Sequence, residues 1–153
     1  MSSTTDYVLD RQISVRRDLD TVFPFFAEAA NLQRITPPEL HFRIRSELPV
    51  EMKKGAVIEY TIRLYGIPMR WRTLITGWDP PHSFEDTQID GPYRKWVHTH
   101  SFERRGENTI ISDRVVYALP FGLLGRLVHP LVKRQLRRIF GYRTAEVSRV
   151  FEA

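Results

Sequence analysis

The middle of the chain alternates between apolar and polar positions with a period close to two residues. This alternation runs from Leu40 to Leu119 and is typical of strands, because successive strand side chains point to opposite faces. Turn-forming stretches such as Tyr65-Gly66 and Arg105-Gly106 interrupt it. With a similar segment near the N-terminus, the pattern predicts seven strands: Tyr7–Val15, Leu40–Ser46, Ala56–Leu64, Met69–Trp78, Ser83–Ile89, Tyr93–Arg104 and Thr109–Leu119.

Two short helices are predicted between the first and second strands. Asp18 or Asp20 would cap the first, over Thr21–Ala30, whose apolar residues make a wide stripe. The second, Asn31–Ile35, would end before two consecutive prolines, because proline cannot continue the hydrogen bonds of a helix.

The C-terminal part, Leu123–Phe151, has the pattern of a long amphipathic helix with arginines opposite an apolar face. Pro130 is expected to kink this helix or to mark where its regular part begins. The apolar face is predicted to contain Leu124, Leu127, Leu131, Leu136, Ile139, Phe140, Val147 and Val150.

This order of elements predicts an α+β fold, in which a seven-stranded curved antiparallel sheet wraps around the long C-terminal helix. With 153 residues, 42% apolar and 27% charged, the chain fits one globular domain, 1–153. The absence of cysteine excludes disulfides and thiolate chemistry. The N-terminus lacks the apolar core of a signal peptide and no apolar run is long enough to span a bilayer, so we expect a cytoplasmic protein.

The positive charge is concentrated near the C-terminus. Residues 1–121 contain 16 Lys and Arg and 16 Asp and Glu, whereas residues 122–153 contain seven Arg and Lys and two Glu. Such a segment is either a solvated helix face or a contact with an anionic membrane surface. Nucleic acid is not expected as a partner, because the aromatic residues fall on the inner face of the sheet, away from the basic residues.

Residue parity places titratable groups on the inner face of the sheet. Asp113 shares the parity of Val115, and His98 and His100 share the parity of Trp96. Buried polar groups cost free energy unless they are paired, so this mixed face favours a cavity lined by water or ligand. The residues predicted to bind a ligand are Tyr60, Ile62, Trp71, Thr73, Trp96, His98, His100, Phe102, Asp113 and Tyr117.

These titratable groups allow three interpretations. The histidines are simply hydrogen-bonded by Asp113 and Tyr117, or they hold a metal ion, or one of them is a catalytic acid or base oriented by Asp113. Two histidines and one acid are few ligands for a metal, so no metal or cofactor is predicted. In the catalytic case, Tyr60 or Tyr117 would donate to a developing enolate. No motif of a serine hydrolase, a phosphate-binding loop or a zinc protease is present.

The motifs ITPPEL, PMRWRT and DRVVYALPFG resemble those of bacterial SRPBCC proteins, in the START-like or Bet v 1-like superfamily that includes polyketide cyclase/dehydrase and lipid transport proteins. The resemblance covers nearly the whole chain. It implies the helix-grip fold, with a deep hydrophobic cavity between the sheet and the C-terminal helix. Because this scaffold serves carriers, receptors and enzymes, the resemblance does not fix an activity.

We therefore expect a monomer or homodimer that binds a small hydrophobic or aromatic molecule such as a lipid, quinone or polyketide, with transport of that molecule as a further role. The alternative is a cyclase or dehydratase, of lyase or isomerase type, that uses His98 or His100 as its acid–base group. The entrance to the cavity is predicted at Pro120–Gly125 and around Gly66–Pro68.

Overall fold

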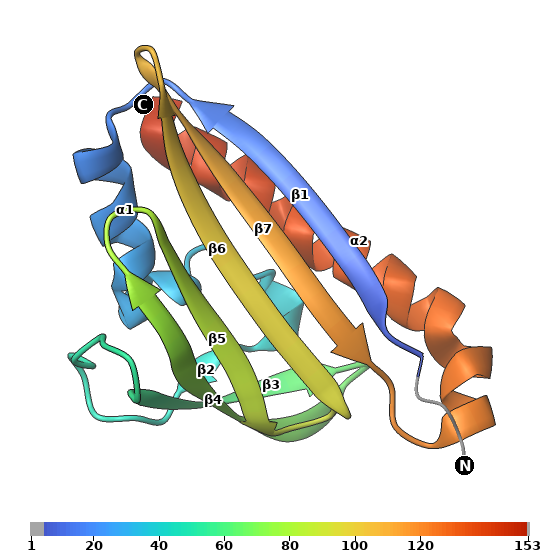
Figure 1. Ribbon diagram of the computed structural model, residues 1–153. Coiled ribbons are helices and arrows are strands. Elements are labelled where there is room, and N and C mark those ends of the chain that lie inside the picture. Colours follow the sequence, from blue (N-terminus) through green and yellow to red (C-terminus); the bar gives the residue numbers. More distant parts are fainter. Residues whose placement is uncertain (1–4, 153) are drawn as a thin grey trace.

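A seven-stranded antiparallel sheet curves around a long C-terminal helix, in the helix-grip arrangement of an α+β fold (Figure 1). The computed structural model describes residues 5–152; residues 1–4, part of the N-terminal segment considered above for a signal peptide, lie outside the described residues. The strands are β1 (Tyr7–Val15), β2 (Arg43–Ile44), β3 (Val57–Leu64), β4 (Ile67–Asp79), β5 (Ser83–Asp90), β6 (Lys95–Arg105) and β7 (Asn108–Ala118). The helices are α1 (Leu19–Ala27), α2 (Gly122–Glu152) and the 3-10 helices η1 (Ala29–Leu32) and η2 (Pro38–Leu40).

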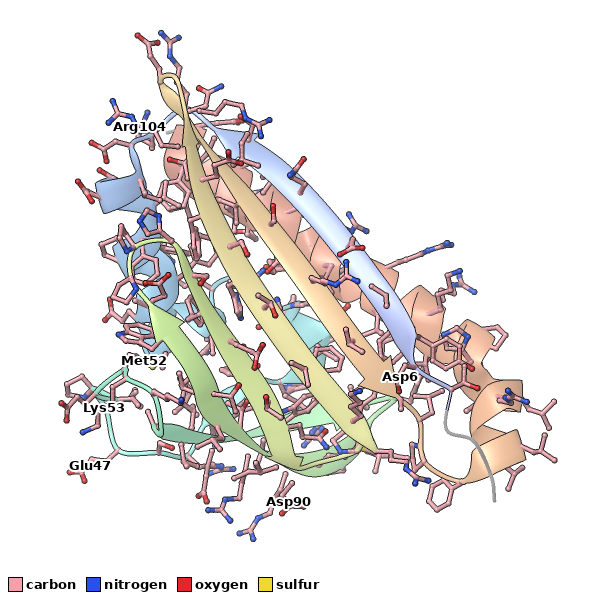
Figure 2. The ribbon with its side chains drawn as sticks, in the orientation of Figure 1. Asp6, Glu47, Met52, Lys53, Asp90 and Arg104 are labelled. Carbon is pink, nitrogen blue, oxygen red and sulfur yellow. The ribbon has the colours of Figure 1, made fainter. Side chains whose placement is uncertain are left out.

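The strand order is β1-β7-β6-β5-β4-β3-β2, so every pair except β1 with β7 joins neighbours in the sequence. Tyr65 and Gly66 turn the chain between β3 and β4 with φ of 53° and 79°, and Gly106 does so between β6 and β7 with φ of 63°. These are the turns that the sequence pattern predicts. In Figure 2 the loop between β2 and β3 carries the exposed side chains of Glu47 and Lys53 away from the sheet.

The second predicted strand, Leu40–Ser46, is wrong over most of its length, because only Arg43–Ile44 pairs with β3. Pro38 starts η2, and His41 then adopts a left-handed conformation with φ of 46°. A left-handed residue cannot continue a strand. The short β2 therefore forms one edge of the sheet.

The predicted short helices exist with different bounds. Asp18 caps α1, since the backbone N–H of Thr21 donates to Asp18 Oδ1 at 2.8 Å, and the helix therefore begins at Leu19 and not at Thr21. Glu28 is extended (φ −98°, ψ 112°) and ends α1. The second helix is a 3-10 turn that begins two residues and ends three residues earlier than predicted.

The face that α2 turns toward the sheet differs from the predicted one. Leu136, Phe140 and Val147 are buried as expected, but Leu124 and Leu127 are 65% and 75% exposed. Leu131, also predicted to face the sheet, is 58% exposed. Pro130 lies inside one continuous helix and does not mark its start. The buried residues of α2 are Gly125, Leu136, Phe140, Arg143, Val147 and Phe151. Their spacing of three, four, seven or eleven residues is that of one helix face.

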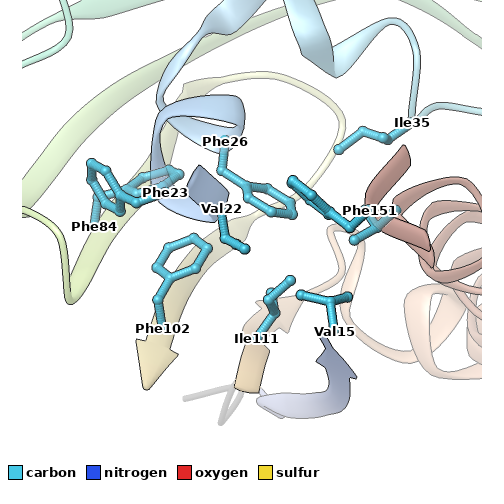
Figure 3. Packing of buried hydrophobic residues seen from close by; sticks show 10 residues of the cluster. Val15, Val22, Phe23, Phe26, Ile35, Phe84, Phe102, Ile111 and Phe151 are labelled. Carbon is cyan, nitrogen blue, oxygen red and sulfur yellow. The ribbon is translucent and has the colours of Figure 1, made fainter. Parts of the chain in front are cut away.

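The core consists of two large clusters that leave room between them. In one, Val22, Phe23 and Phe26 of α1 pack against Phe84 and Phe102 of the sheet (Figure 3). The other gathers aromatic rings of the sheet against α2, and its buried members are Leu40, Ile62, Leu64, Trp71, Tyr93, Trp96, Val115, Tyr117, Leu136 and Phe140. Among the helices of the described residues, none is long and apolar enough to cross a membrane.

Two glycines of α2 offer a matched test of how closely this helix approaches the loop that precedes it. A Cβ atom on Gly125 would lie 2.4 Å from the carbonyl oxygen of Pro120, whereas a Cβ on Gly141 meets nothing within 4 Å. We expect Gly125→Ala to lower the free energy of unfolding by about 1–3 kcal/mol, because a backbone atom must move. Gly141→Ala should raise it by about 0.5–1 kcal/mol through helix propensity. Urea unfolding of both variants checks this, and equal midpoints would contradict the close contact.

Candidate functional site

A cavity of about 110 Å³ lies between the inner face of the sheet, α1 with η1, and α2. Its walls are mostly aromatic and aliphatic, and β5, β6 and α2 contribute an aspartate, two histidines and an arginine. The lining side chains include Phe25, Phe26, Ile58, Tyr60, Thr73, Ile75, Phe84, Asp86, Trp96, His98, His100 and Arg143. A cavity lined by apolar rings with a few polar groups is the usual form of a small-molecule site, although about 300–1,000 Å³ is more typical. A ligand larger than a single ring must therefore displace part of a wall.

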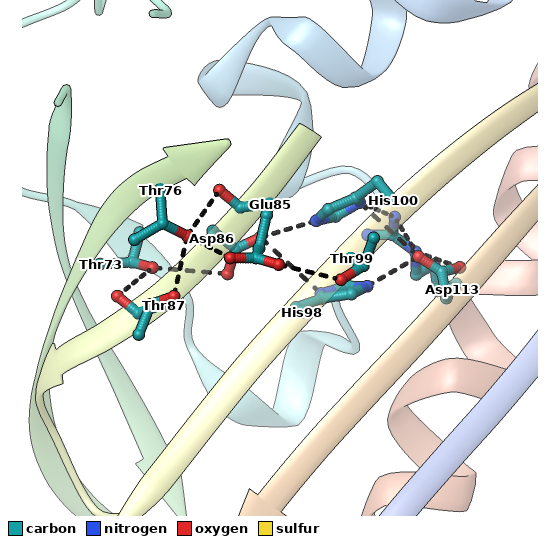
Figure 4. Close-up of polar contacts among 10 residues, drawn as sticks. Thr73, Thr76, Glu85, Asp86, Thr87, His98, Thr99, His100 and Asp113 are labelled. Atoms are coloured by element: carbon teal, nitrogen blue, oxygen red, sulfur yellow. Dashed lines mark hydrogen bonds and ion pairs between the residues drawn. The ribbon is translucent and has the colours of Figure 1, made fainter. Parts of the chain in front are cut away.

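Five side chains on four elements form a buried histidine–aspartate network beside the cavity. His100 Nε2 lies 2.6 Å from Asp86 Oδ2, and His98 Nε2 lies 2.8 Å from Asp113 Oδ1 (Figure 4). The two imidazole rings stack with their centroids 3.7 Å apart. Arg143, from α2, donates to both oxygens of Asp113 at 3.1 and 3.3 Å. The network therefore spans β5, β6, β7 and α2.

The contacts assign the protons of both histidines. Arg143 Nη2 lies 3.3 Å from His100 Nδ1, so this nitrogen accepts and Nε2–H donates to Asp86. His98 Nε2–H donates to Asp113, because an ionised carboxylate can only accept. His98 Nδ1 is left with Asp86 Oδ2 at 3.9 Å, beyond hydrogen-bond distance. Of the four ring nitrogens, His98 Nδ1 is therefore the one available to a ligand.

Burial and charge set the protonation of the network. Burial raises the pKa of Asp113, but the Arg143 guanidinium and the hydrogen bond from His98 outweigh burial and hold this pKa well below its usual range. Burial also raises the pKa of Asp86, and His100 and His98 more than offset this. The pKa of His100 falls to about 4, because burial and the neighbouring His98 disfavour its charged form. Both carboxylates are therefore held in their charged form by the cation and the imidazoles beside them.

A metal ion fits this arrangement poorly. Asp86, His98 and His100 each offer one ligand atom, all within 4.8 Å of one another. However, Asp86 and His100 are already joined by a 2.6 Å hydrogen bond, and the Arg143 guanidinium occupies the other nitrogen of His100. A cation beside a guanidinium is repelled in a buried site. The geometry therefore disfavours a metal ion at this position.

The structure brings five of the ten predicted binding residues to the cavity: Tyr60, Thr73, Trp96, His98 and His100. Asp113 lies behind His98, within the network. Phe102 is buried among the rings of the first core cluster, and Ile62, Trp71 and Tyr117 belong to the second. The hydroxyl of Tyr117 is 3.0 Å from His129 Nε2, so Tyr117 does not satisfy His98 or His100.

Two residues of the network were missed by the sequence analysis. Asp86 shares the parity of Phe84 on β5, and that parity is the signal that could have identified it. Arg143 was assigned with the other basic residues to the exposed face of the helix, and this is wrong: it is 8% exposed. Its spacing from Phe140 and Val147 places it on the buried face, but its charge argued for the surface.

A second, almost wholly apolar cavity of about 270 Å³ lies near the start of α2. Its lining includes Tyr65, Ile67, Phe121, Leu124 and Gly125, from the two segments predicted as the entrance. A layer of aromatic rings stands between the two cavities. Trp96 lines the first cavity and Tyr93 the second, and their ring centroids are 4.7 Å apart. In the same layer, the indole N–H of Trp71 is buried without a hydrogen-bond partner among the described residues.

The fold of the chain is similar to the folds of several solved structures. An aromatase/cyclase from a Streptomyces species is 15% identical, with a TM-score of 0.76 over 97% of this chain and 94% of that one. A norcoclaurine synthase variant from Thalictrum flavum, in complex with a transition-state analogue, is 14% identical, with a TM-score of 0.72 over 99% and 97%. A START superfamily protein from Mycobacterium smegmatis is 13% identical, with a TM-score of 0.67 over 94% and 98%. No family model and no curated protein sequence matches the chain.

Two arginines of α2 test the energetic weight of the buried network. Arg143 and Arg138 each pair with a carboxylate, but Arg143 is buried, whereas Arg138 and Glu39 are 57% and 51% exposed. We expect Arg143→Met to lower the free energy of unfolding by about 3–5 kcal/mol, because Asp113 is left buried without its cation. Arg138→Met should cost about 1 kcal/mol or less. Urea unfolding measures both, and a similar small loss in each would contradict the structural role of the buried pair.

Proposed function

We propose that the protein binds a small hydrophobic or aromatic molecule in the cavity between the sheet and α2, as a carrier. The observation that carries this proposal is the cavity itself, whose aromatic walls meet a polar network with one free imidazole nitrogen. Structural neighbours titled as an aromatase/cyclase and as a synthase bound to a transition-state analogue support small-molecule binding on this scaffold. At 13–15% identity they support no particular ligand.

The two cavities favour a ligand with a polar ring and an apolar tail. The first cavity, of about 110 Å³, has room for one ring beside Trp96, with a carbonyl or hydroxyl toward His98. The second, of about 270 Å³, offers an almost purely apolar space beyond the aromatic layer. A rotation of Trp96 or Tyr93 would join the two spaces. A quinone, a polyketide-like ring compound and a lipid with a compact polar group all combine a polar part with an apolar part.

Trp96 and Trp78 provide the test of ligand placement. Trp96 lines the cavity, whereas Trp78 lies on β4 in the core and outside the lining. We expect Trp96→Ala to weaken binding about tenfold or more, because its buried aromatic area is worth roughly 1.5–3 kcal/mol. Trp78→Ala should leave the affinity nearly unchanged.

The ligand for this test is the compound released by solvent extraction from protein purified without detergent, identified by native mass spectrometry. Where no compound is released, anilinonaphthalene sulfonate fluorescence is the probe. Equal affinity of the Trp96→Ala variant and the unchanged protein would place the ligand elsewhere.

A second candidate function, acid–base catalysis on a carbonyl compound, is favoured by the state of His98. His98 Nε2–H donates to Asp113 Oδ1, 2.8 Å from Nε2, which leaves Nδ1 without a hydrogen bond beside a cavity that Tyr60 also lines. His98 could remove a proton next to a carbonyl while the Tyr60 hydroxyl donates to the enolate oxygen. His100 is a weaker candidate, because both of its nitrogens are already hydrogen-bonded. Such a reaction would be that of a cyclase or dehydratase.

Histidine replacements test the catalytic alternative. If the protein turns over the compound identified above, or a carbonyl compound found by substrate screening, we expect His98→Gln to reduce the rate about 100-fold or more. His82→Gln, in the exposed turn between β4 and β5, is the control and should change nothing. Circular dichroism shows that each variant is folded. Turnover that survives replacement of both His98 and His100 would rule out this mechanism.

A further inference from the structure

One end of the molecule exposes an unusual number of large apolar side chains. They come from the β3–β4 turn, the loop between β7 and α2, and the first turns of α2, which project past the end of β7 in Figure 1. We refer to this set as the apolar end. Its members are Tyr65, Ile67, Phe121, Leu123, Leu124, Leu127, Val128 and Leu131, each at least 46% exposed. Exposed apolar groups gathered in one place mark an interaction site more often than isolated ones do.

The backbone holds the apolar end in this position. Phe121 and Tyr65 both have positive φ, 67° and 53°, a conformation that bulky residues rarely adopt. The hydroxyl of Tyr65 donates to the carbonyl of Leu131 at 2.9 Å and so ties the β3–β4 turn to α2. Gly125 is buried against the Pro120 carbonyl, which turns the neighbouring Leu124 outward. The exposure of these residues is therefore built into the loop and the helix.

Positive charge continues from the apolar end along α2. Residues 122–145 contain no Asp or Glu, and Arg126, Lys133, Arg134 and Arg137 are exposed. Arg134 follows Leu127 and Leu131 at spacings of seven and three residues, which places all three on one helix face. An apolar face bordered by cations is the pattern of a helix that lies on an anionic bilayer.

We propose that the apolar end docks onto an anionic lipid bilayer, with its leucines and Phe121 in the interfacial region and the cations of α2 against the headgroups. A second copy of the chain is the less suitable occupant. A two-fold interface through this end would bring the same acid-free cationic segment of both copies together, and like charges repel. An anionic bilayer offers both an apolar interior and opposite charge.

Docking in this orientation would place the second cavity against the lipid. That cavity is lined by Tyr65, Ile67, Phe121, Leu124 and Val128, which are themselves part of the apolar end. A hydrophobic ligand could then pass between bilayer and protein without crossing water. This consequence rests on the proposed carrier function, whereas docking itself does not.

Vesicle flotation tests the docking. Vesicles of phosphatidylcholine alone and of phosphatidylcholine mixed with phosphatidylserine are compared at low and high salt. We expect binding only to the anionic vesicles, and weaker binding at high salt because the charges are screened. Binding to neither kind of vesicle, or equal binding to both, would overturn the proposal.

Paired variants locate the contact. Leu123→Ser with Leu127→Ser, and separately Lys133→Gln with Arg134→Gln, should each reduce the partition coefficient about tenfold or more. None of these four residues lines either cavity. Val8→Ser with Leu48→Ser is the control, because these residues are 51% and 50% exposed but lie on β1 and in the β2–β3 loop. A leucine variant that floats like the unchanged protein would overturn the proposal, and so would sedimentation showing a dimer that this variant disrupts.

The same variants separate docking from ligand binding. Affinity for anilinonaphthalene sulfonate is measured without vesicles, and the Leu123→Ser/Leu127→Ser variant should retain it. Loss of flotation with retained affinity supports docking through this end. A protein that floats but binds no ligand keeps the docking proposal and contradicts the proposed function.

Discussion

The buried ion pair between Arg143 and Asp113 is the interaction that most constrains this structure. It joins the middle of α2 to β7, with the two residues 8% and 7% exposed. A buried charge is tolerable only when it is paired and fully hydrogen-bonded, so α2 cannot turn about its axis without leaving both groups unpaired. The pair thereby fixes which face of α2 meets the sheet. This fixed orientation of α2 about its axis buries Gly125 and leaves Leu123, Leu127 and their neighbours in contact with solvent.

The same pair prepares the two histidines. With its carboxylate held by Arg143, Asp113 fixes the ring of His98 and leaves Nδ1 without a hydrogen, while Arg143 also holds His100 in the same tautomer, with its hydrogen on Nε2. Stacked imidazoles are poor sites for two protons, which agrees with the low pKa of His100. The network thus presents one ring nitrogen without a hydrogen bond, His98 Nδ1, at the cavity wall. That nitrogen suits either a hydrogen bond to a bound ligand or a proton transfer.

The sheet is predicted well from the sequence, because the patterns that identify strands and turns involve residues that are close together in the chain. Alternation and turn residues identify seven strands and their inner face, so His98, His100 and Asp113 are correctly placed together. The first turns of the helix face were mispredicted because the buried stripe of α2 contains a glycine and an arginine, whereas leucines occupy its exposed turns. Hydrophobicity alone cannot detect a stripe held by a close backbone contact and an ion pair. The partner of Arg143 lies thirty residues away, and its identity depends on the tertiary fold.

The interior of the protein is polar at the histidine–aspartate network and almost wholly apolar at the second cavity. At one end the network offers charge and hydrogen bonds, and at the other the second cavity offers almost no polar surface. Between them stand Trp96 and Tyr93, with the unpaired indole N–H of Trp71 in the same layer. A buried donor without a partner costs about 1–3 kcal/mol, and a ligand acceptor that reached it would recover part of this cost. A molecule that passed from the second cavity to the first would have to move Tyr93 or Trp96 aside before its polar group reached His98.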